Sequence, residues 1–119
     1  MNKVFLVGNL TKDPELRYTQ SGKATARMSI AINQGYGDKQ TTDFFNLVAW
    51  EKTAELCDKF LSKGSKILVD GRLKNNNYEK DGVKHYGVDV IVISIEFLDK
   101  KKFEQKNNVE TDDNDDIPF

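Results

Sequence analysis

The chain has 119 residues, of which 38% are hydrophobic and 31% charged, with a formal net charge of −1 at pH 7. This length suits one domain with a modest core and leaves little surplus for burying a large active site. No run of about 18 apolar residues occurs, which excludes a membrane-spanning helix.

The start of the chain and its single cysteine suggest a location. The first residues read at once as a strand, with no basic segment followed by an apolar one, so we expect no secretory signal. Cys57 is the only cysteine and forms no internal disulfide, which fits a reducing compartment. We therefore expect a cytoplasmic protein.

Charge is divided unevenly along the chain. All 18 lysines and arginines precede residue 107 together with 14 of the 19 acidic residues, so that part carries +4. The last thirteen residues hold five acids and no base, which gives −5. A basic body with an acidic tail suggests a polyanion-binding surface and an interaction tail, and a soluble domain with a solvating tail is the plainer alternative.

The first half of the chain reads as strands. Residues 3–10 form the first, and residues 15–19 continue the sheet after a turn. Residues 24–33 alternate between apolar and polar side chains, as a half-buried strand does. A polar loop at residues 34–41 then leads to a strong strand at residues 42–50.

The hydrophobic period changes after residue 50. Apolar residues recur at helical spacing over residues 51–61. A fourth strand is predicted at residues 65–78, with Ile67, Val69, Gly71 and Leu73 on one face. A hairpin turn at residues 80–82 separates it from a long fifth strand at residues 83–98. Both faces of residues 90–95 are apolar apart from Ser94, so we expect that part to be covered on both sides.

This order of elements predicts an all-β fold. Three strands, one short helix and two strands are what a five-stranded OB barrel gives, with its helix between strands three and four. A two-layer sheet with one helix is the structural alternative. We expect residues 1–100 to form this domain and residues 101–119 to form a short charged linker and an acidic tip. Residues 107–119 should be disordered in the free protein.

The sequence contains no catalytic constellation. His85 is the only histidine and Cys57 the only cysteine, and they have no spacing that would build a zinc site. No phosphate-binding glycine loop is present. We interpret Cys57 as a core residue and His85 as a surface residue beside the hairpin. The prediction is a protein without catalytic activity, metal or cofactor.

The third strong strand has two different faces. One face is uniformly apolar and suits a barrel interior: Phe45, Leu47 and Ala49. The other face mixes large rings with an amide and suits an apolar but wet surface: Phe44, Asn46, Val48 and Trp50. Rings that stack on unpaired bases, with nearby cations that follow phosphates, are typical of single-stranded nucleic-acid binding. The alternative is that the rings pack a core or a subunit interface.

The candidate binding residues combine rings, one amide and cations from several segments. They are Tyr36, Phe44, Asn46, Trp50, Tyr78, Tyr86, Lys3, Arg17, Arg72 and Lys74.

Four separated motifs resemble the bacterial and phage single-stranded DNA-binding proteins, the SSB family. They are NKVFLVGNLTKDPELRY at residues 2–18, the stretch at residues 44–65, DGRL at residues 70–73 and DDIPF at residues 115–119. The resemblance implies an OB-fold homotetramer in the cytoplasm, associated with the nucleoid. It also implies sequence-independent binding that protects single-stranded DNA during replication, recombination and repair. By position, its stacking rings would be Tyr36, Phe44, Trp50 and Tyr78, and Phe45 would lie near a subunit contact.

The acidic tip has its own physical logic. Its acids would attract a basic partner, and its apolar residues would anchor in a pocket. The predicted tip residues are Asp112, Asp113, Asp115, Asp116, Ile117, Pro118 and Phe119. The resemblance implies that replication, recombination and repair proteins are the partners. The family usually has a long linker rich in Gly, Pro and Gln before the tip, whereas residues 101–111 are short and charged.

Two other functions remain open at this point. An RNA-binding OB module would share the rings and cations, because nothing in the sequence reads a 2′-hydroxyl directly. An adaptor whose barrel only oligomerises and presents tails would share the tip. Competition between DNA and RNA oligomers, and quenching of Trp50 fluorescence by oligo-dT, separate these alternatives.

Overall fold

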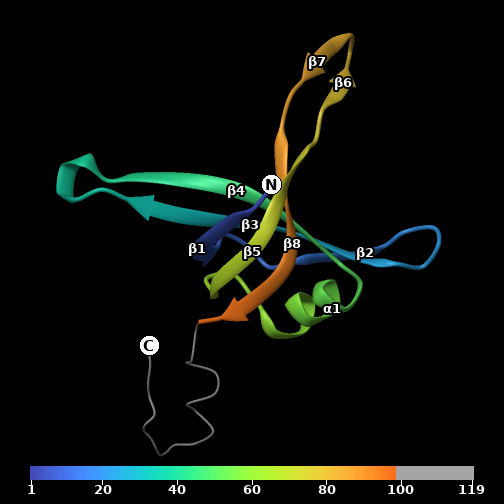
Figure 1. The fold of residues 1–119 in the computed structure, drawn as a ribbon, viewed down its shortest axis with the longest axis horizontal. Helices are drawn as coiled ribbons and strands as arrows, with labels where there is room; N and C mark the ends of the chain where they lie inside the picture. Colours follow the sequence, from blue (N-terminus) through green and yellow to red (C-terminus); the bar gives the residue numbers. More distant parts are fainter. Residues whose placement is uncertain (99–119) are drawn as a thin grey trace, which may run out of the picture.

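The computed structural model describes residues 1–98, so the linker and tip predicted for residues 101–119 lie outside the described residues. In chain order the elements are β1 (Val4–Leu10), β2 (Glu15–Tyr18), β3 (Ala24–Gln34), a 3₁₀ turn (Gly37–Lys39), β4 (Thr41–Trp50), α1 (Glu51–Phe60), β5 (Lys66–Asn75), β6 (Tyr78–Lys80), β7 (Val83–His85) and β8 (Val88–Phe97). Figure 1 shows the strands crossing at the centre, with arms projecting from them.

Five strands close into a barrel. They follow the order β1-β5-β8-β4-β3, and β1 also pairs with β3, which joins the two ends of the series. The β4–β8 pair is parallel, while the other four pairs of the barrel are antiparallel. With α1 between the third and fourth barrel strands, this is the arrangement of an OB barrel. The predicted fold class is confirmed, and closure rules out the open two-layer sheet.

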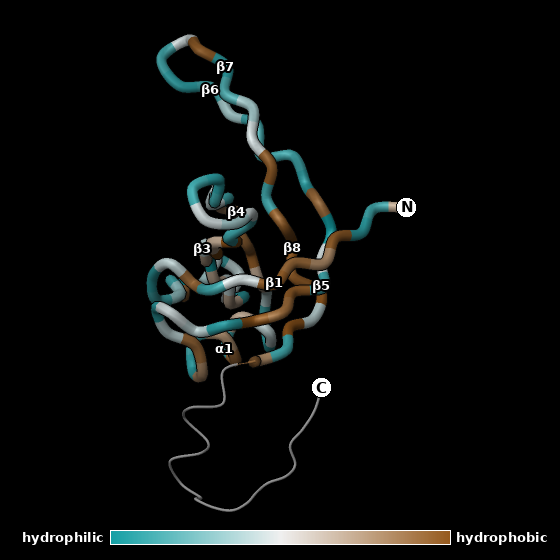
Figure 2. Tube along the Cα trace, turned by 90° about the vertical axis from the view of Figure 1, so that its left-hand side faces the viewer, coloured by the Kyte–Doolittle hydropathy of each residue, from teal (hydrophilic) through white to brown (hydrophobic). Residues whose placement is uncertain are grey.

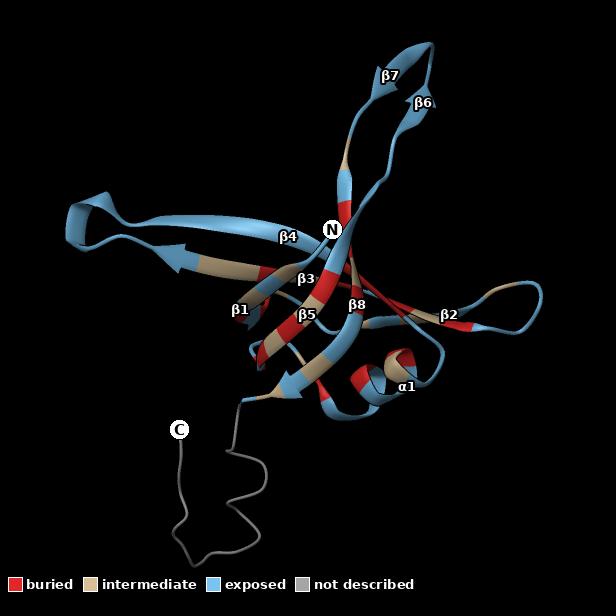
Figure 3. Cartoon of the chain, in the orientation of Figure 1, coloured by how far each residue is buried: buried red, intermediate tan, exposed pale blue. Residues whose placement is uncertain are grey.

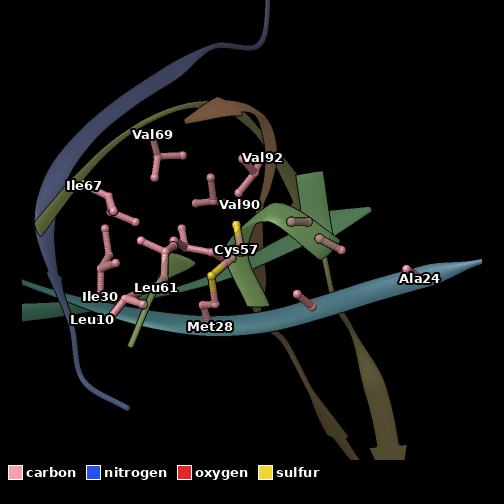
Figure 4. Close-up of a cluster of buried hydrophobic side chains, with 14 residues drawn as sticks. Leu10, Ala24, Met28, Ile30, Cys57, Leu61, Ile67, Val69, Val90 and Val92 are labelled. Atoms are coloured by element: carbon pink, nitrogen blue, oxygen red, sulfur yellow. The ribbon is translucent and has the colours of Figure 1, made fainter. Parts of the chain in front are cut away.

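The core lies inside the barrel. The inward side chains come from every barrel strand and from α1: Leu10, Ala24, Ala26, Met28, Ile30, Leu47, Ala49, Ala54, Cys57, Leu61, Ile67, Val69, Val90 and Val92. Figure 4 shows Cys57 beside Met28 and Val90, within this cluster. The alternation predicted for β3 and the core position predicted for Cys57 are both confirmed.

Strand segments that leave the barrel form exposed arms. Figure 3 shows buried residues near the crossing of the strands, on and just after α1, and at the start of β3 beside β2, whereas the β6–β7 arm and the outer part of the β3–β4 arm are exposed. Hydropathy follows the same division, since brown segments lie around the labels of β1, β5 and β8 while the β6–β7 arm is largely teal or white (Figure 2). The position of the arms is therefore set by the geometry of the chain and not by burial of their side chains.

The two predicted long strands are each divided. The fourth becomes β5 and β6, and the fifth becomes β7 and β8. Across the breaks the Asn76 backbone NH donates to the Gly87 carbonyl at 2.9 Å, so the β6–β7 arm continues from the barrel. Asp81 and Gly82 have φ of 53° and 78°, which makes the predicted turn a two-residue turn of type I′ character.

The exposure of three side chains differs from the prediction. The prediction that residues 90–95 are covered on both faces is wrong for the single chain, because Ile93 is 52% exposed. A bulge moves the register from Asp70↔Ser94 to Gly71↔Val92, so Ile93 has no ladder partner on β5. Phe45 is also exposed, since its segment of β4 has left the barrel and pairs only with β3. Leu73 on β5 is exposed as well, beyond the buried Gly71.

Residues 1–98 contain neither a helix that could span a membrane nor a cluster of metal ligands. Their one α-helix, α1, has ten residues, and no helix there is long and apolar enough to cross a membrane. Within the same residues, no three His, Cys, Asp or Glu side chains come together as metal ligands.

Candidate nucleic-acid interface

β4 sets one outer face of the barrel and its arm. Antiparallel ladder partners lie on the same face of a sheet. The register Ala31↔Phe44, Ser29↔Asn46, Arg27↔Val48 and Thr25↔Trp50 therefore aligns four rows of side chains across β3 and β4. Phe44 is 64% exposed and Trp50 is 41% exposed, while Val48 between them is buried. This is the mixed aromatic and polar face that the alternation predicted.

The two exposed rings on β4 are well separated. Trp50 follows Phe44 by six positions along β4, which is about 20 Å at the usual rise of a strand. Rings at that spacing are too far apart to stack on the same nucleobase. The face is therefore able to hold a strand along its length.

Trp50 is held at a sharp local turn. It is the last residue of β4 and the N-cap position of α1, and Glu51 follows with φ of 54°. This left-handed conformation lets the chain pass from strand to helix within one residue. The indole is thereby fixed at the end of the face, beside its ladder partner Thr25.

Arg17 is the predicted cation that lies nearest in register to Trp50. It pairs with Thr25 on β3, which in turn pairs with Trp50 on β4. The three side chains therefore share one row across β2, β3 and β4. This row places an arginine and the indole of Trp50 on the same outer face.

Arg72 and Lys74 approach the same face from the other side of the barrel. Arg72 pairs with Ile91 on β8, and Ile91 pairs with Val48 on β4. Lys74 lies one row further out, opposite Asp89. The structure thus brings both residues onto the outer surface next to β4.

Lys3 has other partners. Its Nζ lies 2.8 Å from the Oδ1 of Asp70 and 5.6 Å from the centre of the Phe5 ring. Its charge is therefore compensated locally. It is the least available of the predicted phosphate contacts.

The three tyrosines lie on arms outside the barrel. Tyr36 lies in the loop at the end of the β3–β4 arm, and Tyr78 and Tyr86 lie on or next to the β6–β7 arm. All three are exposed. Their rings are open to solvent, as predicted from their loop and hairpin positions, but they do not form one cluster with Trp50.

Sequence reasoning missed one cation on this face. Arg27 occupies the row between Thr25 and Ser29 on β3, and its Nη2 lies 3.4 Å from the Oδ2 of Asp89. The one sequence signal was that Arg27 points away from the core on an alternating strand. Its partner is not readable from sequence, because 62 residues separate the two and only the barrel joins them.

A closed five-stranded barrel with exposed rings and arginines on one outer face defines the class of OB-fold proteins that bind single strands. Comparison with known proteins places the chain more narrowly. The model of the single-strand binding protein family matches residues 1–98. The chain belongs to the single-strand binding protein family, which confirms the resemblance carried by its motifs.

Several curated relatives are similar over most of this chain. The "Single-stranded DNA-binding protein" of Bacillus cereus is 46% identical over 105 residues, which cover 85% of this chain and 62% of the relative. "Single-stranded DNA-binding protein 2" of Listeria monocytogenes is 45% identical over 114 residues, covering 92% and 69%. "Single-stranded DNA-binding protein 1" of Staphylococcus aureus is 44% identical over 118 residues, covering 96% and 70%.

The match covers only part of the relatives. The chain spans about six tenths of the length of the Bacillus proteins that it matches. The relatives' names are those of binding proteins and not of enzymes, in agreement with the prediction of no catalytic activity.

Proposed function

We propose that this chain binds single-stranded DNA without sequence specificity, through base stacking and phosphate contacts. The observation that carries the proposal is the outer face of β4, where the exposed rings of Phe44 and Trp50 share ladder rows with β3. Arg17 and Arg27 lie in adjoining positions on the same face. Rings accept any base, and cations follow any phosphate backbone, so this surface selects single strands and not a sequence.

The remaining predicted contacts extend this face. Asn46 lies between the two rings, and Arg72 and Lys74 lie on the neighbouring β5. Tyr36, Tyr78 and Tyr86 would stack bases along the arms. Lys3 is assigned a secondary part, because Asp70 already compensates its charge.

Fluorescence of Trp50 tests the proposal directly, because it is the only tryptophan in the chain. Oligo-dT should quench this emission at low salt. The logarithm of the affinity should fall with the logarithm of salt concentration, with a slope of about −0.7 for each phosphate contact. Absence of quenching at low salt would favour the adaptor alternative. Equal affinity for DNA and RNA oligomers would refute the restriction to DNA.

We further propose that the chain works as a homotetramer. Exposed apolar side chains on several barrel strands support this: Phe5, Val7, Phe45 and Ile93. Monomeric proteins rarely leave large contiguous apolar patches open to water. Sedimentation equilibrium should give four times the chain mass, and a monomer mass at micromolar concentration would contradict the assembly.

The cellular role and partners are proposed from the family and the sequence. Binding would protect single-stranded DNA in replication, recombination and repair, in the cytoplasm. Residues 112–119, beyond the domain at residues 1–100, would recruit proteins of those processes. Deletion of residues 112–119 should abolish recruitment while DNA binding is kept or becomes tighter, because the polyanionic segment no longer competes. Loss of DNA binding in this variant would contradict the proposed division of labour.

A further inference from the structure

The β6–β7 arm holds a pair of stacked rings that the residues proposed above do not account for. Tyr78 and His85 are ladder partners, their ring centroids lie 4.8 Å apart, and their planes differ by 11°. Each ring covers one side of the other and leaves its outer side open. Tyr78 is 55% exposed and His85 is exposed as well. The pair therefore presents two outward aromatic faces.

A pocket adjoins these rings. It measures about 240 Å³ and is lined by Asn77, Tyr78, Glu79, Lys84, His85 and Tyr86. This is below the range of about 300–1,000 Å³ that drug-sized ligands occupy. A single planar base suits it better than a larger ligand does.

The charged side chains of the β6–β7 arm balance one another. Between Tyr78 and Tyr86, Lys80 and Lys84 balance Glu79 and Asp81. On β6, the strand packed against β7, the charged groups are Glu79 and Lys80. Side chains alternate between the faces of a strand, so Glu79 and its ladder partner Lys84 lie on the opposite face from His85.

On the two strands of the arm, no acidic side chain shares a face with the imidazole of His85. Lys80 lies two residues from Tyr78 on that face, and the one other acid of the arm, Asp81, lies in the turn. On the strands of the arm, the face that carries the two rings therefore offers a passing phosphate a cation and no repelling carboxylate.

We propose that His85 is a DNA-contacting residue, because with Tyr78 it forms a two-ring platform on which nucleobases stack. The platform holds one base against the outer face of each ring. This inference rests on the proposed function, because it assumes that single-stranded DNA follows the arm.

Three variants of the full chain test the platform. His85→Ala removes the ring, His85→Phe keeps a ring without a titrating group, and Val83→Ala truncates a neighbouring exposed side chain on β7 as the matched control. Affinity for oligo-dT is measured through Trp50 emission at pH 8. Circular dichroism before each titration establishes that the variants have the wild-type fold.

At pH 8, His85→Ala should weaken binding about fivefold to tenfold, the equivalent of about one stacked base. His85→Phe and Val83→Ala should stay within about twofold of the wild type at that pH.

Two results would overturn the inference. Equal affinity of His85→Ala and wild type would show that the ring makes no contact. Equal loss in His85→Phe and His85→Ala at pH 8 would show that stacking is not its contribution. In both cases wild-type quenching still supports single-strand binding, whereas absence of wild-type quenching would refute the proposed function itself.

Discussion

Arg27 and Asp89 form an ion pair across the outer face of the barrel, with Nη2 and Oδ2 3.4 Å apart. Asp89 is only 7% exposed, and within residues 1–98 its other carboxylate oxygen is buried without a hydrogen-bond partner. A buried carboxylate is costly unless a cation accompanies it. Arg27 therefore has two tasks, since it compensates Asp89 and its half-exposed guanidinium also faces the proposed DNA path.

Replacing Arg27 should therefore affect stability as well as binding. Arg27→Ala leaves Asp89 without its cation, and we expect the free energy of unfolding to fall by about 1–3 kcal/mol. Urea denaturation measures this. Arg17→Ala removes an exposed arginine of the same face and should change stability by less than about 0.5 kcal/mol. Equal midpoints for the two variants would contradict the compensating part of Arg27.

The rings on β4 should dominate affinity. Phe44→Ala and Trp50→Ala are each expected to weaken oligo-dT binding by about tenfold, since one stacked base is worth about 1–3 kcal/mol. Anisotropy of a labelled oligonucleotide reports affinity without relying on Trp50. Leu56→Ala on α1 truncates an exposed apolar residue outside the β4 face and is the control. If all three variants bind alike, stacking on β4 is not the source of affinity.

The left-handed residue between β4 and α1 offers a stabilising change. Glu51 has φ of 54°, a conformation that costs a residue with a Cβ about 1–2 kcal/mol. Glu51→Gly should relieve this backbone strain, and the relief should exceed the cost of the added entropy of the unfolded chain. We expect the free energy of unfolding, measured by thermal or urea denaturation, to rise by about 0.5–1 kcal/mol. Removal of a carboxylate beside Trp50 should also tighten DNA binding. In contrast, Glu55→Gly inside α1 should destabilise by about 1 kcal/mol.

Gly71 of β5, opposite the bulge in β8, requires glycine for lack of space. A Cβ on Gly71 would lie 2.6 Å from the Ile91 carbonyl oxygen and 2.8 Å from the Val90 Cγ1. Gly71→Ala should destabilise the barrel by about 2 kcal/mol or more, because backbone must move. For comparison, Gly37→Ala meets no atom within 4 Å and has only its φ of 52° to strain it. It should cost about 1–2 kcal/mol. Equal urea midpoints for Gly71→Ala and wild type would refute the steric argument.

The buried thiol predicts how stability depends on alkaline pH. Burial raises the pKa of Cys57 to about 11 from its ordinary value of 9.0. The folded protein then holds this proton more tightly than the unfolded chain does, so the contribution is complete below pH 9 and is lost as pH rises through about 11. Cys57→Ala removes this term, so its stability loss relative to wild type should shrink between these pH values. A constant difference would contradict the assignment.

Most of the strand predictions came from local sequence patterns. On β3, Ala26, Met28 and Ile30 alternate with polar residues, and all three are buried. The Asp81–Gly82 turn could be predicted because a type I′ turn needs two successive left-handed residues, and Asp-Gly pairs adopt this conformation readily. The motifs of residues 2–18 and 44–65 pointed to the family that the comparisons then showed.

Errors arose where burial depends on distant strands. Phe45 belongs by alternation to the inner face of β4, with Leu47 and Ala49, yet it lies where β8 no longer pairs with β4. Ile93 was expected to be covered, and a bulge opposite Gly71 left it exposed. Both depend on where the barrel ends and where its register shifts, which are properties of paired strands.

The same division holds for the site as a whole. Local sequence determined that Phe44 and Trp50 share a strand face and that Tyr78 lies near a hairpin, because alternation and turn chemistry act over a few residues. Only the tertiary structure decided that Arg27 meets Asp89, that Arg17 shares a row with Trp50, and that His85 stacks on Tyr78. Those contacts depend on strand order and register, which are set by closure of the barrel around its core.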